Sequence, residues 1–68
     1  MNASVLKGKW RQLSGSAKAR WGALTDNELQ EVSGDVDRFV GLLQEKLGVS
    51  QSEARRQIED WVNEHELS

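Results

Sequence analysis

The sequence predicts an all-α fold, a small four-helix domain made of two helical hairpins that share one core. First, the glycines form two trains with a spacing of seven residues, and the second train repeats the first 26 residues later. Second, apolar residues recur every three or four positions, which is typical of one helical face. Third, a helix-capping box follows each train. The glycines are Gly8, Gly15, Gly22, Gly34, Gly41 and Gly48.

The first helix is predicted over about residues 4–21. Its apolar residues lie within an arc of about 80° at 100° per residue, on the side opposite the glycines. A break at Ser14-Gly15 remains an alternative, and a left-handed Gly22 is expected to end the helix. The apolar residues are Leu6, Trp10, Leu13, Ala17, Trp21 and Leu24.

The second helix, about residues 26–33, begins at the capping box formed by Thr25 and Glu28. The third helix, about residues 36–47, has Gly34 at its entrance and is expected to end at a left-handed Gly48. Its apolar stripe consists of Val36, Phe39, Leu43 and Leu47.

The fourth helix, about residues 51–63, begins at a second capping box, Ser50 to Glu53. It is expected to bury Ala54, Ile58, Trp61 and Val62. Neither hairpin alone can cover its apolar stripe. The hairpins, about 4–33 and 34–63, are therefore predicted to form one domain over residues 1–68.

Three glycines, Gly8, Gly15 and Gly41, lie within predicted helices. Each costs about 0.8–1 kcal/mol relative to alanine, while a core of this size supplies only about 3–5 kcal/mol of net stability. Two explanations stay open: another helix or a partner approaches these backbones closely, or a labile fold is tolerated. Gly8→Ala and Gly15→Ala are each predicted to raise the melting temperature.

The composition limits the class of protein. There is no cysteine, so neither a disulfide nor a thiolate metal site can supplement the core. No apolar run approaches the roughly 18–20 residues of a membrane span, and the start, MNASVLKGKWRQ, lacks the apolar region of a signal peptide. A protein that is cytoplasmic and not transmembrane is therefore predicted.

Charge is distributed unevenly along the chain. Residues 1–25 hold five cations and no acid, whereas residues 26–68 hold eleven acids and four cations. In one interpretation the basic segment docks on the acidic remainder of its own chain, or both are solvated faces. In the other it forms a basic face for a polyanion.

The segment GKWRQLSGSAKARWGALTD, followed by the second glycine train, resembles the CsbD-like family of small bacterial stress proteins. The matching residues are Gly8, Trp10, Gln12, Gly15, Lys18, Trp21, Gly22, Leu24, Thr25, Asp26, Gly34, Gly41, Gln44, Gly48 and Ala54. The resemblance extends to about Trp61 and implies a SAM-domain-like helical arrangement and production under general or osmotic stress. It implies no catalytic residue or ligand.

Residues for catalysis are scarce. His65 is the single histidine and is expected to be an exposed tail residue, because one imidazole without cysteine makes a poor metal site. The sequence contains no G-x-S-x-G motif and no P-loop. We therefore predict no enzymatic activity, no catalytic, cofactor-binding or metal-binding residue, and no cofactor.

Two patterns favour anion binding. Residues 43–58 loosely resemble a helix-hairpin-helix phosphate motif with two adjacent arginines, although the alternative, a glycine-terminated helix followed by a capped one, is favoured. Basic residues also flank both edges of the first apolar stripe, as on a surface helix, although its tryptophans are favoured as core residues. The candidate anion-binding residues are Lys7, Lys9, Arg11, Lys18, Arg20, Arg55 and Arg56.

The leading prediction is a small soluble, non-enzymatic bacterial stress-response protein that acts through binding or its own hydration, with an unidentified partner. The alternative is a protein that binds nucleic acid or an anionic membrane surface through the basic first helix, which gives steep salt dependence. A homodimer through the exposed glycine stripes is a third hypothesis.

Overall fold

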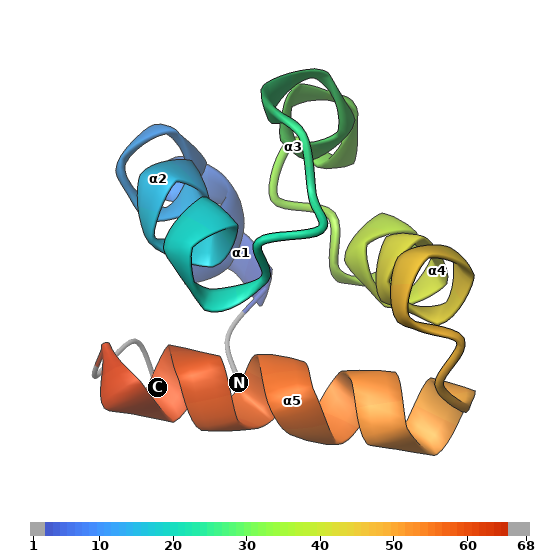
Figure 1. The fold of residues 1–68 in the computed structure, drawn as a ribbon. Coiled ribbons are helices and arrows are strands. Elements are labelled where there is room, and N and C mark those ends of the chain that lie inside the picture. The colour runs from blue at the N-terminus through green and yellow to red at the C-terminus, as the bar shows by residue number, and fades with distance from the viewer. Residues whose placement is uncertain (1–2, 66–68) are drawn as a thin grey trace.

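The computed structural model describes residues 3–65, and these residues form helices joined by short turns, without strands (Figure 1). The all-α prediction is therefore confirmed for the described chain. The helices are α1 (Ala3–Gly8), α2 (Trp10–Arg20), α3 (Asp26–Val32), α4 (Val36–Leu47) and α5 (Gln51–Glu64). The number of helices was predicted wrongly, because the first predicted helix is divided into α1 and α2.

The division lies at Lys9, whose backbone (φ −107°, ψ 10°) departs from helical geometry. The Lys9 N–H still donates to the Val5 carbonyl at 3.0 Å, so the chain bends without losing this bond. The alternative of a break at Ser14-Gly15 is wrong, since both residues lie inside α2. The bend lets Leu6 on α1 and Trp10 on α2 both face the core.

Side chains cap three of the helices. Both hydrogen bonds of the predicted capping box of Thr25 and Glu28 are present at the start of α3. Ser50 accepts from the Glu53 N–H at 3.1 Å, while the Glu53 carboxylate bonds to Arg56 instead of completing the box. The sequence analysis missed the cap of α4, where the Asp35 side chain accepts two backbone N–H bonds.

Of the two glycines predicted to end a helix in the left-handed conformation, one does so and one does not. Gly48 ends α4 in the left-handed conformation, with φ 66°, as predicted. The same prediction for Gly22 is wrong: α2 ends at Arg20, its C-cap residue is Trp21 with φ −122°, and the described residues with positive φ are Ser33, Gly34 and Gly48. The chain therefore leaves α2 at Trp21 without a left-handed residue, and the Trp21 side chain is buried.

The core is one apolar cluster. All six residues of the first predicted stripe are buried, as are the four predicted for α5. Leu47 was predicted wrongly, because it is 36% exposed, and Val40 is buried in α4 instead. Leu29 and Val32 attach α3 to the same cluster, which the sequence analysis did not foresee.

The helices pack in chain order, with α3 between α2 and α4, and α5 against α4. Figure 1 shows α5 running beneath the other helices. In this view α1 and α2 lie above the C-terminal half of α5, and α4 lies above its beginning. The two-hairpin, SAM-domain-like arrangement stays a prediction. Within residues 3–65, no helix has the length and apolar character needed to cross a bilayer.

Gly15→Ala is expected to stabilise the fold. A Cβ added at Gly15 would meet no heavy atom within 4 Å, so alanine gains about 0.8–1 kcal/mol of helix propensity without a clash. The expected rise in melting temperature is about 4–8 °C per kcal/mol, measured by circular dichroism. Gly8→Ala, equally open, is expected to change in the same direction, and an unchanged or lower melting temperature in both variants would contradict the open environment.

Candidate binding surface and the contacts behind it

Each of the three indole N–H groups bonds to a different helix. Trp10 on α2 donates to the Leu29 carbonyl at 2.8 Å. Trp21 donates to Gln57 Oε1 at 2.8 Å, and Trp61 on α5 donates to Ser16 Oγ at 3.2 Å. The prediction that the tryptophans are core residues is confirmed, because at most 8% of each is exposed. Their N–H groups therefore fix helix positions and are not available to a ligand.

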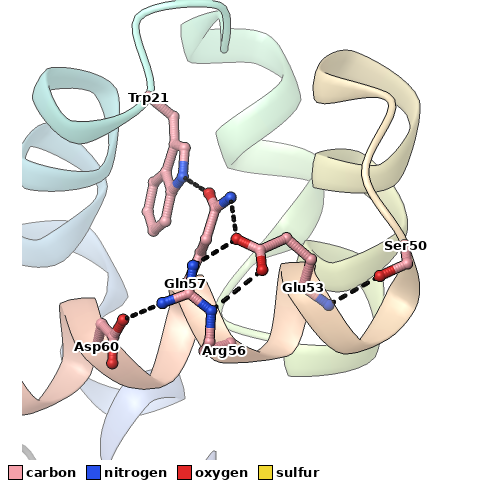
Figure 2. Close-up of polar contacts among 6 residues, drawn as sticks. All are labelled: Trp21, Ser50, Glu53, Arg56, Gln57 and Asp60. Carbon is pink, nitrogen blue, oxygen red and sulfur yellow. Dashed lines mark hydrogen bonds and ion pairs between the residues drawn. The ribbon is translucent and has the colours of Figure 1, made fainter.

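The Trp21 indole is hydrogen-bonded to Gln57, which belongs to a polar network along α5 (Figure 2). Gln57 Nε2 donates to Glu53 Oε2 at 3.0 Å, and Arg56 donates to both Glu53 oxygens at 3.1 and 2.6 Å. Arg56 also donates to Asp60 Oδ2 at 3.0 Å. The hydrogen bonds from Arg56, and next from Gln57, hold the pKa of Glu53 below its ordinary value. This network occupies Arg56, one of the candidate anion-binding residues.

His65 is exposed, as predicted, but it is not isolated. Its Nε2 lies 2.6 Å from Ser16 Oγ, and its ring meets the Trp61 ring with centroids 5.6 Å apart. Ser16 Oγ already accepts the Trp61 N–H, so its own hydrogen can be donated to a neutral imidazole. Ser16 lies inside α2, where backbone N–H groups bond within the helix and cannot serve as an oxyanion hole. The contact attaches the end of α5 to α2.

Four of the seven candidate cations are paired with acids of their own chain. Lys18 lies 3.0 Å from Asp26, and Arg20 lies 3.5 Å from Glu64. Both pairs join the basic segment to the acidic remainder, which favours the own-chain interpretation for these residues. The other two paired cations are Arg55, at 3.4 Å from Asp37, and Arg56, described above.

The helix-hairpin-helix interpretation receives no support at its arginines. Arg55 and Arg56 both contact carboxylates, and the Ser50 hydroxyl already bonds to one N–H in the first turn of α5. A phosphate there would have to displace these contacts and approach several acids. The turn between α4 and α5 therefore fits the alternative, a left-handed glycine followed by a capped helix.

Three candidate cations, Lys7, Lys9 and Arg11, are exposed and form no ion pair within residues 3–65. We call them the bend cations, because they lie on both sides of the α1–α2 bend. Lys7 lines a surface depression that also contains Asp35 and Asp37. The structure thus leaves fewer unpaired cations than the sequence predicted.

The family model described as CsbD-like matches residues 5–56. The chain belongs to the CsbD-like family. It is 48% identical over 61 residues to a UPF0337 protein of Pseudomonas aeruginosa, which covers 90% of this chain and 94% of that protein. It is 43% identical over 63 residues to a UPF0337 protein of Bordetella pertussis (93% and 96%), and 33% identical over 66 residues to the UPF0337 protein YjbJ of Escherichia coli (97% and 96%). No solved structure gives a significant match.

Among the ion pairs of this CsbD-like fold that sequence reasoning missed, one joins α3 to α4. Lys46 Nζ lies 2.8 Å from Glu28 Oε2, and the two side chains are 33% and 23% exposed. The Lys46 hydrogen bond, followed by that from the Thr25 backbone, lowers the pKa of Glu28, and the same contact raises the pKa of Lys46. Because the partners lie on different helices, no local spacing could reveal the pair, which connects α3 to α4.

The lowered pKa of Glu28 predicts a loss of stability in acid. Its contribution is complete above the ordinary value of 4.5 and disappears as the pH falls through the lower folded-state pKa. Glu28→Gln is therefore expected to reduce the urea midpoint near pH 7 and to weaken its decline toward about pH 3. The contribution of Lys46 to the stability is lost only when the pH rises above its ordinary pKa of 10.5, because the pKa of Lys46 is raised in the folded protein.

Urea unfolding at both pH values measures this effect. Glu59→Gln is the matched control, since Glu59 is exposed and has no ion pair among the described residues. Equal acid sensitivity in wild type and Glu28→Gln would contradict a stabilising role for the Glu28–Lys46 pair.

Proposed function

We propose that this CsbD-like protein is a non-enzymatic bacterial stress-response protein of the cytoplasm that acts by binding a partner through its surface. The observation that carries the proposal is the set of bend cations, Lys7, Lys9 and Arg11. They are the candidate residues that the chain leaves without a carboxylate partner over residues 3–65. A surface that is not used internally is available for a partner.

The chemistry of the remaining polar groups supports this proposal. No polar or charged residue of the described chain is buried, so the core of residues 3–65 offers no acid or base whose pKa could be tuned for catalysis. The histidine contacts Ser16 within a helix, where no free backbone donors can stabilise an oxyanion. The stress role comes from the family resemblance, and the surface role comes from the unpaired cations.

A complementation experiment tests the proposal. In a bacterium lacking its CsbD-like gene, wild-type protein is expected to restore survival after an osmotic upshift, while the Lys7→Gln, Lys9→Gln, Arg11→Gln triple variant is not. His65→Gln is the matched control, because glutamine can still accept a hydrogen bond but cannot act as a general base. Loss of rescue by His65→Gln would overturn the non-enzymatic proposal, and unchanged survival of the deletion strain would overturn the stress role.

A second candidate function, binding of nucleic acid or an anionic membrane surface, is favoured by the same three cations. Neutralising three phosphates would give a slope of about −2.7 for the logarithm of affinity against the logarithm of salt concentration. Titrating labelled DNA and anionic vesicles at low and moderate salt separates these outcomes. Absence of binding at low salt would remove this candidate.

A further inference from the structure

We propose that this protein associates with copies of itself head to tail. In this arrangement, the bend cations of one molecule dock on the groove between α3 and α4 of the next. The inference deepens the proposed function, since it assigns a partner to the same cations. It rests on complementary charges that the fold leaves at two separate places.

Equal numbers of cations and carboxylates remain outside the ion pairs of residues 3–65. Apart from Lys7, Lys9 and Arg11, every lysine and arginine of residues 3–65 contacts a carboxylate. On the acidic side, the unpaired residues of the same range are Glu31, Glu45 and Glu59. Three cations thus remain on the α1–α2 bend and three carboxylates remain on α3, α4 and α5.

Two of the unpaired carboxylates line one groove. Glu31 of α3 and Glu45 of α4 border it, with Val32 and the half-buried Leu42 between them. The groove also contains Gly41, where an added Cβ would meet no heavy atom within 4 Å, so a second helix has room to approach. The groove therefore combines negative charge with an apolar floor.

Arg38 also lines this groove and brings one positive charge to it. Its Nη1 donates to the Glu31 backbone carbonyl at 3.2 Å, and its Nε lies 4.0 Å from Asp35. Glu28, another lining residue, is paired with Lys46. The side chains of Glu31 and Glu45 form no ion pair within residues 3–65, and the lining residues of the groove carry three carboxylates and one cation.

Within residues 3–65, no bend cation forms an ion pair with a carboxylate of this groove. Figure 1 shows α1 and α2 on one side of α3, and α4 on the other. A contact between different surfaces of identical chains is heterologous and generates open chains of molecules. A second copy satisfies both sets of charges at once, whereas a polyanion would satisfy the cations and be repelled by the groove.

Sedimentation velocity at several protein concentrations tests the association. Because exposed ion pairs are weak, we expect the weight-average mass to exceed 7.7 kDa as the protein approaches about 1 mM. The excess mass is expected at about 0.01 M salt and to decline at about 0.15 M, where the screening length falls from about 30 Å to about 8 Å. A mass that stays monomeric at low salt and about 1 mM protein overturns the proposal.

Charge-reversal variants identify the surfaces. The groove variant Glu31→Lys, Glu45→Lys and the bend variant Lys7→Glu, Lys9→Glu, Arg11→Glu are each expected to remain monomeric, and their mixture is expected to associate again. Glu59→Lys, outside the groove, is the control and should associate like wild type. A mixture that stays monomeric, or a groove variant that associates like wild type, overturns the inference.

The groove variant also separates this inference from polyanion binding. It retains Lys7, Lys9 and Arg11, so a polyanion-binding protein would still bind DNA or anionic vesicles after the groove is reversed. Loss of self-association with retained rescue of the deletion strain would overturn the assigned partner and leave the proposed binding function intact. Loss of both supports self-association as the active state.

Discussion

Trp61→Ala is expected to leave most of the chain unfolded at room temperature. Trp61 is 1% exposed, and besides the His65 ring its ring makes edge-to-face contacts with three core aromatic rings. Its centroid lies 6.3 Å from that of Trp10, 5.4 Å from that of Trp21 and 5.7 Å from that of Phe39. Truncating a buried tryptophan to alanine costs about 3–5 kcal/mol, which is similar to the net stability that a domain of this size commonly has.

Urea unfolding followed by far-ultraviolet circular dichroism measures this loss. Leu47→Ala is the control, because Leu47 is 36% exposed and its truncation is expected to cost less than about 0.5 kcal/mol. Ser16→Ala separates packing from hydrogen bonding, since it keeps the Trp61 ring and removes the hydroxyl that accepts the Trp61 N–H and contacts His65, at about 1–3 kcal/mol. A Trp61→Ala variant that keeps the wild-type midpoint would show that the aromatic cluster does not hold the helices together.

The apolar spacing predicted the interior well where one face of a helix meets the core. Leu6, Ala17 and Leu24, spread over nineteen positions of the first predicted stripe, are at most 2% exposed. A spacing of three and four residues determines the direction of each side chain around the helix axis. It could not place the bend at Lys9, because both segments around it keep the same face inward.

The repeat of 26 residues predicted too much symmetry. Trp21 and Leu47 occupy corresponding positions, yet Trp21 is 5% exposed and Leu47 is 36% exposed. The glycines that follow them also differ, since Gly48 has a positive φ and Gly22 does not. Periodicity indicates which way a residue points, but whether another helix covers it depends on packing between elements distant in sequence.

The candidate surface shows the same limit. Pairs within one helix, such as Arg56 with Asp60, follow from a spacing of four residues. Pairs between helices, such as Arg20 with Glu64, depend on the fold and could not be derived from spacing. The sequence therefore predicted where cations are concentrated, and only the structure separated those that are paired from the bend cations.

Gly34→Ala is expected to destabilise the fold by about 2–5 kcal/mol, the opposite of Gly15→Ala. Gly34 is buried, with φ +78°, and a Cβ there would lie 2.5 Å from the Lys7 Cα and 3.2 Å from the Leu6 carbonyl oxygen. The left-handed conformation costs a residue with a Cβ about 1–2 kcal/mol, and forcing extra volume into a packed contact costs about 1–3 kcal/mol. Both obstructing atoms belong to the backbone of α1, so no rotamer change can relieve the clash.

This substitution contrasts Gly34 with the costly glycines inside the predicted helices, Gly8, Gly15 and Gly41. Close approach of another helix applies at Gly34, where α1 packs against the turn before α4, whereas Gly15 and Gly41 have open space around them. Thermal unfolding of Gly34→Ala beside Gly15→Ala should therefore give shifts of opposite sign. Equal shifts for both variants would mean that α1 does not pack on the α3–α4 turn. If Gly34→Ala alone lowers the melting temperature, a close contact explains why this position of the repeat is a glycine. The glycines on open helix surfaces instead reduce the stability of the fold, and substitution by alanine restores it.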